Sequence, residues 1–136
     1  MPKPYYQIED VAAKTGLTKR ALRYYEDIEL INPIRTEAGY RLYTDEDVAR
    51  ALRIIEIKEV LGFSLNDIKS IMGLESILKD ILSGKTKDPQ IIEDSIKGVR
   101  EHLNKVRNKQ EMLARNITKS EEVLNRLNSI YEGLKE

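Results

Sequence analysis

The chain has 136 residues, of which 34% are charged and 6% aromatic, and it contains no tryptophan and no cysteine. This composition disfavours a large packed core and favours helices with a solvated face, so we expect a mainly α-helical protein. The lack of cysteine excludes disulfides and thiolate metal or redox sites, and 23 basic residues balance 23 acidic ones, so bulk charge does not indicate nucleic-acid binding. No signal-peptide pattern or membrane-spanning apolar run is present, and we expect a cytoplasmic protein.

The N-terminal part predicts two helices joined by a tight turn. Ile8 and Val11 recur at helical spacing, and the sequence TGL at 15–17 then interrupts the pattern with a glycine. Thr18 can cap a second helix over about 19–28, because its hydroxyl can accept a hydrogen bond from an unpaired first-turn amide. Two helices joined in this way form a helix-turn-helix unit.

A change of period after Pro33 predicts a small hairpin, with a turn centred on Glu37 to Gly39 and a strand over 40–43. Thr44 and three following carboxylates then predict the start of a third helix over about 45–60.

Two more helices are predicted before a linker. Ser64 and Asp67 have the spacing that opens a fourth helix. A short amphipathic piece over 77–82 predicts one further helix, which the linker SGKTKD follows.

The C-terminal third predicts one long helix with an apolar seam, opened by Asp88 and Pro89. Alternating steps of four and three residues from Ile92 to Leu134 reach thirteen positions, and eleven of these are apolar where about five are expected by chance. The seam consists of Ile92, Ile96, Val99, Leu103, Val106, Leu113, Ile117, Leu124, Leu127, Tyr131 and Leu134. A lone helix cannot bury such a seam, so we expect a coiled-coil partner.

Polar residues interrupt the seam twice, at Gln110 and Ser120, and could fix register or orientation at some loss of stability. Thr118 and Glu121 have capping-box spacing, which leaves open a helix break near 116–118.

One face of the second helix carries Arg20, Arg23 and Tyr24, whereas Leu22 points inward. Thr18 and Lys19 lie beside the free amides at the helix N-terminus. Guanidinium groups suit phosphates and guanine edges, and a tyrosine combines an apolar ring with a polar tip. This face therefore predicts a surface that binds DNA. The hairpin that follows adds Arg35, Arg41 and Tyr43 where a winged helix-turn-helix makes its second backbone contact.

A family resemblance adds to this interpretation. The run IEDVAAKTGLTKRALRYYEDIELINPIRTEAGYRLYTDEDV, followed by LGFSLNDIKSIM, resembles the mercury-resistance-regulator (MerR) family of bacterial transcription factors over about residues 6–74. Ala21 stands where threonine is frequent in the family, and DIEL replaces a more usual glycine before Leu30. The resemblance implies a winged helix-turn-helix DNA-binding domain over 1–74, a short helix and linker over 75–88, and a coiled-coil dimerisation helix over 89–136 that pairs antiparallel in a homodimer.

The same resemblance implies a function and a set of contact residues. Family members bind a near-palindromic operator in an over-long promoter spacer and then bend and untwist it, so that RNA polymerase can use both promoter elements. The implied DNA-binding residues are Thr18, Lys19, Arg20, Arg23 and Tyr24 in the recognition helix, Arg35, Tyr40, Arg41 and Tyr43 in the wing, and Lys58 near the end of the third helix.

Few features point to an effector or to another class of protein. The family's metal and redox sensors use cysteines that this chain lacks, so we expect no cofactor, and the only histidine, His102, fits a surface position beside the seam. The family suggests a small lipophilic effector near residues 75–83. No catalytic motif is present, so we expect no enzyme. The remaining alternative is a coiled-coil assembly or adaptor protein, which would lack a steep salt dependence of DNA binding.

Overall fold

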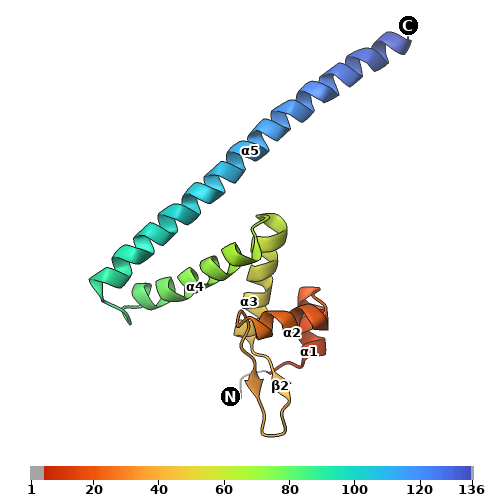
Figure 1. Cartoon of the computed structure of the whole chain (residues 1–136). Helices are drawn as coiled ribbons and strands as arrows, with labels where there is room; N and C mark the ends of the chain where they lie inside the picture. The colour runs from red at the N-terminus through yellow and green to blue at the C-terminus, as the bar shows by residue number, and fades with distance from the viewer. Residues whose placement is uncertain (1–4, 136) are drawn as a thin grey trace. The chain divides into compact units, whose positions relative to one another are not determined.

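The computed structural model describes residues 5–135 and is mainly α-helical, as the composition and periodicity predict (Figure 1). The chain divides into two compact units, Met1–Ser76 and Ile77–Glu136. In chain order the described elements are α1 (Ile8–Thr15), α2 (Lys19–Asp27), β1 (Ile34–Arg35), β2 (Arg41–Leu42), α3 (Asp45–Ile55), the π-helical turn η1 (Glu56–Val60), α4 (Leu65–Leu82) and α5 (Pro89–Lys135). None of these helices combines the length and apolar character that crossing a bilayer requires.

Local capping fixes the helix-turn-helix. α1 ends at Gly16, whose φ of 79° is a left-handed conformation that glycine adopts without a steric penalty, and its amide donates to the carbonyl oxygen of Ala12 at 2.9 Å. Thr18 Oγ1 accepts a hydrogen bond from the amide of Ala21 at 3.0 Å, which confirms the predicted cap of α2. The two helices therefore begin and end where their own sequence dictates.

Apolar side chains from every helix of the first unit form its core. Leu22 and Val11 have no exposed surface, and Tyr25 is 5% exposed whereas its neighbour Tyr24 is 47% exposed. The largest fully buried side chains are Val11, Leu22, Ile31, Tyr43, Ile54, Ile57 and Ile68. The two neighbouring tyrosines of α2 thus have different surroundings: the ring of Tyr25 packs in the core, and the ring of Tyr24 faces outward.

The hairpin is short and is anchored at its base. β1 and β2 pair antiparallel, with Ile34 opposite Leu42 and Arg35 opposite Arg41. Tyr6 and Tyr43 form an isolated antiparallel bridge, in which each amide donates to the other residue's carbonyl oxygen at 2.7 and 2.8 Å. This bridge ties the segment before α1 to the end of the hairpin.

The helix predicted over 45–60 has two parts. α3 opens with a capping box between Thr44 and Asp47, as predicted, and runs to Ile55. It then widens into η1, where the amide of Leu61 donates to the carbonyl oxygen of Glu56 at 3.1 Å. A π-type turn contains more residues per turn than an α-helix, so it changes which side chains face inward, and here it keeps Ile57 buried.

The C-terminal region differs from the sequence prediction in one element. The separate helix predicted over 77–82 is wrong, because α4 continues without interruption from Leu65 to Leu82. The possible break near 116–118 is also absent: α5 is one helix of 47 residues, and the hydroxyl of Thr118 donates to the carbonyl oxygen of Ala114 at 3.2 Å instead of capping a new helix.

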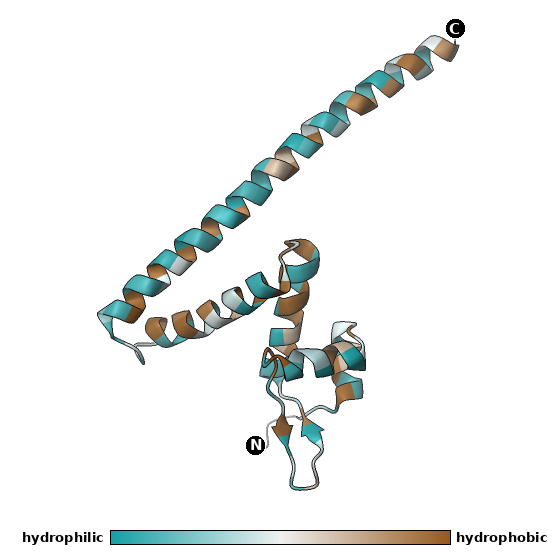
Figure 2. Cartoon of the chain, in the orientation of Figure 1, coloured by the Kyte–Doolittle hydropathy of each residue, from teal (hydrophilic) through white to brown (hydrophobic). Residues whose placement is uncertain are grey.

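The apolar seam of α5 is largely uncovered. Figure 2 shows hydrophobic residues recurring along α5 between hydrophilic ones. Leu113, Ile117, Leu124 and Leu127 are 64%, 57%, 56% and 57% exposed. Large apolar side chains exposed at regular intervals indicate a surface that another molecule covers.

Removing the hydroxyl of Tyr43 and removing that of Tyr6, both at the base of the hairpin, should change the stability of the protein in opposite directions. No described residue hydrogen-bonds the buried hydroxyl of Tyr43, and burial raises the pKa of this tyrosine. Removing an unpaired buried hydroxyl removes its desolvation cost, so we expect Tyr43→Phe to raise the free energy of unfolding by about 1 kcal/mol.

Tyr6→Phe is the matched comparison, because the hydroxyl of Tyr6 donates to Asp45 Oδ1 at 2.7 Å and this bond raises the pKa of Tyr6 above 10.0. Because the pKa of Tyr6 is higher in the folded than in the unfolded protein, its protonated hydroxyl stabilises the fold at pH values below the ordinary pKa of tyrosine. This contribution is lost as the pH rises through the pKa that Tyr6 has in the folded protein. We therefore expect Tyr6→Phe to lower stability at neutral pH by an amount that shrinks in strong alkali. Urea unfolding of the unmodified protein, Tyr43→Phe and Tyr6→Phe measures the three free energies of unfolding. A loss of stability in Tyr43→Phe would contradict the prediction for its buried hydroxyl.

Candidate nucleic-acid interface

The outer face of α2 presents a row of cations and one aromatic ring. Lys19, Arg20, Arg23 and Tyr24 are all exposed, and the hydroxyl of Thr18 beside them is engaged in capping. Lys19 Nζ lies 3.1 Å from Glu9 Oε1 on α1, with both side chains about half exposed. The two arginines and the tyrosine thus form an accessible surface on a helix that is fixed from below by Leu22 and Tyr25.

The ion pair between Glu9 and Lys19 connects α1 to the exposed face of α2. The pKa of the Glu9 carboxyl is lowered, first by a hydrogen bond from its own backbone amide and then by the Lys19 side chain. Glu9 is therefore ionised at neutral pH, and part of the charge of Lys19 is used within the protein instead of being offered to a ligand.

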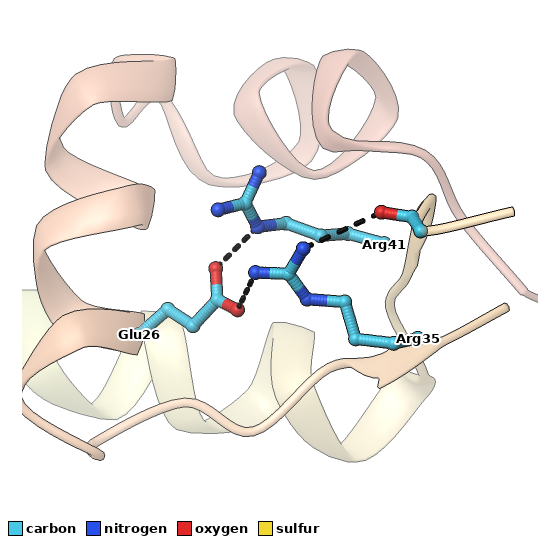
Figure 3. Close-up of polar contacts among 4 residues, drawn as sticks. Glu26, Arg35 and Arg41 are labelled. Carbon is cyan, nitrogen blue, oxygen red and sulfur yellow. Dashed lines mark hydrogen bonds and ion pairs between the residues drawn. The ribbon is translucent and has the colours of Figure 1, made fainter. Parts of the chain in front are cut away.

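A single carboxylate on α2 holds both arginines of the hairpin (Figure 3). Arg41 Nε donates to Glu26 Oε2, and Arg35 donates through Nη2 to Glu26 Oε1 at 3.1 Å. Arg35 also donates through Nη1 to the carbonyl oxygen of Gly39 at 3.3 Å. The Glu26 side chain is only 15% exposed, whereas those of Arg35 and Arg41 are 52% and 29% exposed.

This arrangement solves a local electrostatic problem. Arg35 and Arg41 lie directly opposite each other across the two-stranded sheet, and like charges in that position repel. Glu26 lies between them and accepts from both, so the hairpin is held against the recognition helix. Glu26 therefore positions the wing, a role that sequence reasoning missed. The only available signal was a pair of acidic residues, Glu26 and Asp27, at the end of a helix that begins with cations.

The remaining wing residues divide between surface and core. Tyr40 lies at the turn and is 72% exposed, and Lys58 is exposed on η1. Tyr43 is fully buried, so the inclusion of its side chain among the contact residues is wrong. The physical reason is its backbone bridge to Tyr6, which turns the ring into the core.

Arg50 is a second residue that sequence reasoning did not single out. Its Nε donates to the carbonyl oxygen of Leu30 at 2.8 Å, which links α3 to the segment between α2 and the hairpin. That segment contains Glu29, whose φ of 63° is a left-handed conformation that a residue with a Cβ adopts only at a cost. A charge-assisted bond to Leu30 helps to hold the strained connection between recognition helix and wing.

A metal site is not part of the arrangement. Within residues 5–135, no three or more histidine, cysteine, aspartate or glutamate side chains are grouped so that they could hold a metal ion.

Comparison with protein families gives a match to the MerR HTH family regulatory protein model over residues 6–74, half of the chain. The HTH-type transcriptional regulator YfmP of Bacillus subtilis is 38% identical over 103 residues, which are 74% of each protein. The mercuric resistance operon regulatory protein of Bacillus cereus is 43% identical over 70 residues, so the match spans about half of that relative. The HTH-type transcriptional activator mta of Bacillus subtilis is 46% identical over 68 residues, about a quarter of its length.

Two solved structures share the fold. One is HiNmlR, described as a MerR family regulator lacking the sensor domain and bound to promoter DNA; it is 26% identical, with a TM-score of 0.52 over 79% of this chain and 80% of that one. The other is a MerR family transcriptional regulator from Listeria monocytogenes, 22% identical, with a TM-score of 0.62 over 96% of this chain and 94% of that one. The second likeness concerns the fold alone.

Removing the charge of Glu26 should loosen the wing. In Glu26→Gln the two guanidinium groups stay opposite each other without a neutralising carboxylate, so we expect backbone amides of residues 34–42 to exchange about fivefold faster, equivalent to about 1 kcal/mol. Hydrogen exchange followed by mass spectrometry measures this change. Glu37→Gln, an exposed carboxylate in the turn of the same hairpin, is the matched control and should leave the exchange unchanged. Equal exchange in both variants would remove Glu26 from its positioning role.

Proposed function

Because the chain belongs to the MerR family of helix-turn-helix transcriptional regulators, we propose that it binds a near-palindromic promoter operator as a homodimer and distorts it. The observation that carries this proposal is the exposed face of α2, with Arg20, Arg23 and Tyr24, beside a hairpin that Glu26 holds against the same helix. This family is one of regulators and not of enzymes, which agrees with the expectation that the chain has no catalytic role.

The contact residues have different parts in the proposed complex. Arg20, Arg23 and Tyr24 are free to enter a major groove, and the amides of the first turn of α2 favour a nearby phosphate. Arg35 and Tyr40 are more exposed than the other two candidate wing residues, Arg41 and Tyr43, and we assign them to the DNA backbone. Arg41 keeps the wing in place through Glu26 and reaches DNA less readily, because less of it is exposed. Thr18, Lys19 and Lys58 complete the proposed set.

Dimerisation follows from the seam of α5. Its apolar side chains are more than half exposed over the second half of the helix, and a second copy offers the same seam as a cover. Two copies present two identical α2 faces, which suits an operator with two half-sites. The solved structure of HiNmlR bound to promoter DNA supports DNA binding by this fold.

Distortion is the step that requires both halves. Bending or untwisting a promoter site costs several kcal/mol, and contacts to the backbone on both half-sites must supply that energy. We include RNA polymerase as the partner that uses the distorted promoter. The seam of α5 also fits the adaptor alternative, but that alternative leaves the exposed Arg20 and Arg23 of α2 without an evident task.

Replacing Arg20 or Arg23 by alanine should weaken DNA binding without changing the assembly. If either residue contacts phosphate, the slope of log affinity against log salt should fall by about one for each contact removed, and therefore by about two for a dimer. Fluorescence anisotropy with promoter fragments retained from genomic DNA, measured at several salt concentrations, gives the slope. Arg115→Ala on α5 is the control cation, and unchanged binding in the Arg20 and Arg23 variants would exclude them from the interface.

A charge in the seam should abolish the dimer and DNA binding together. We expect Leu103→Lys to sediment as a monomer, because an unpaired lysine at a seam position would be buried in the dimer at a cost of several kcal/mol. Asn104→Lys introduces the same side chain one position away, outside the seam, and should remain dimeric. An intact Leu103→Lys dimer would show that this seam is not the dimer interface.

A further inference from the structure

We propose one register for the antiparallel pairing of two α5 helices that the family resemblance implies, in which the two-fold axis crosses the coil at the level of residue 115. Gln110 of each chain then faces Ser120 of the partner. This inference rests on the proposed homodimer and takes the antiparallel direction from the family resemblance. What it adds is the register of the coil. It is carried by three features of α5: its polar seam positions, its flanking charges and the hollows along it.

The first feature is the placement of the two polar seam residues. Gln110 and Ser120 lie symmetrically about residue 115, so the antiparallel register that brings them together leaves only apolar pairs elsewhere. Those pairs are Leu113 with Ile117, Val106 with Leu124, Leu103 with Leu127, Val99 with Tyr131 and Ile96 with Leu134. Each amide then meets a hydroxyl, which can exchange a hydrogen bond with it.

Neighbouring antiparallel registers lack this match. A slip of one heptad in one direction brings Gln110 opposite Leu113 and Ser120 opposite Leu103. A slip in the other direction brings Gln110 opposite Leu127 and Ser120 opposite Ile117. In both cases the polar groups face apolar side chains, and burying an unpaired amide costs about 1 to 3 kcal/mol. Because the dimer is symmetric, every mismatch occurs twice.

The second feature is the charge pattern beside the seam, which agrees with the antiparallel direction. A parallel coil would also pair each polar residue with its own copy, so polarity alone does not exclude it. In the antiparallel register, exposed Arg107 lies beside the partner's Glu121, and Glu93 lies beside the partner's Lys135. Opposite charges at these flanking positions set the orientation of coiled coils.

A parallel coil loses both of those charge pairs. Its flanking neighbours would be five residues apart, which pairs Ser95 with Arg100, Asn116 with Glu121 and Ile130 with Lys135. None of these combinations joins opposite charges. The charge pattern of α5 therefore favours the antiparallel direction.

The third feature is a pair of hollows in the second unit. One, of about 410 Å³, is bordered by the seam residues Leu113, Ile117, Ser120 and Leu124. The proposed register brings the partner's Gln110 to this hollow, beside Ser120. A hole formed by four seam residues is the shape that one side chain of a facing helix fills in a coiled coil.

The other hollow, of about 280 Å³, is apolar and lies between α4 and the start of α5, lined by Leu78, Ile81, Ile92, Ser95, Ile96, Val99 and Arg100. In the proposed register the partner's Tyr131 and Leu134 lie opposite Val99 and Ile96, at the mouth of this hollow. Its occupant is therefore the last turns of a second copy of α5, at the place where a lipophilic effector is expected from the sequence.

Introduced cysteines test the register directly, because the full chain has none of its own. In the double variant Gln110→Cys, Ser120→Cys the two thiols lie opposite each other across the interface, so mild oxidation should convert most of the protein into a covalent dimer. The single variants should not cross-link, since each thiol is then ten residues from its copy along the helix axis, roughly 15 Å. Leu103→Cys with Leu127→Cys should cross-link as a second pair from the same register.

Other outcomes of this experiment would overturn the register. Cross-linking of either single variant indicates a parallel coil, and cross-linking of Leu103→Cys with Ser120→Cys, or of Gln110→Cys with Leu127→Cys, indicates a slipped antiparallel one. In those cases the unmodified chain still sediments as a dimer, so the proposed function stands. A chain that sediments as a monomer at all concentrations would overturn both.

A charge exchange gives an independent readout. Arg107→Glu should raise the dimer dissociation constant about tenfold, because it faces the partner's Glu121 twice, and adding Glu121→Arg should restore it to within about threefold. Arg115→Glu makes the same charge change on the outer face of α5 and should leave the constant unchanged. Failure of the exchange to restore dimerisation would contradict the proposed pairing.

Discussion

The apolar seam of α5 is the constraint on which the other features depend. The first turns of this 47-residue helix line a hollow with the last turns of α4, and Ser95 is the single residue of α5 that is buried among those described. Farther along, seam side chains such as Leu113 and Ile117 are more than half exposed. Because the hydrophobic effect scales with apolar area removed from water, a helix of this kind gains most of its stability from a partner. The folding of α5 is therefore coupled to its assembly with a partner.

The DNA-binding unit depends on a different interaction, the carboxylate that α2 turns toward the hairpin. An acidic residue on a surface meant for phosphates works against binding unless its charge is used within the protein. Glu26 meets that condition, since two guanidinium groups surround it and only 15% of its side chain is exposed. The pair Arg35 and Arg41 keeps a net positive charge while the wing is fixed to the recognition helix. In the proposed complex, the side chains that fix the wing are therefore also the ones that give it its positive charge.

Geometric strain is concentrated between the recognition helix and the wing. Glu29 adopts a left-handed backbone conformation directly after α2, at the place where family members more often have glycine, as judged from the sequence resemblance. The bond from Arg50 to the carbonyl oxygen of Leu30 and the bridge between Tyr6 and Tyr43 hold the chain on either side of this turn. A two-stranded hairpin is marginal in isolation, and these two attachments, together with the ion pairs to Glu26, give it a defined position.

The sequence by itself determined the features that depend on neighbouring residues. The cap at Thr18, the capping box at Thr44 and the period of the seam are all set within a few residues, because hydrogen bonds in a helix and the spacing of its faces are local. The family resemblance followed from the same local runs. Only the tertiary structure decided the burial of Tyr43, since a short strand offers two faces and its bridge to Tyr6 selects one. Likewise, the three-dimensional fold alone brings Glu26 to Arg41 across fifteen residues of chain, because salt bridges between separate elements leave no periodic trace in the sequence.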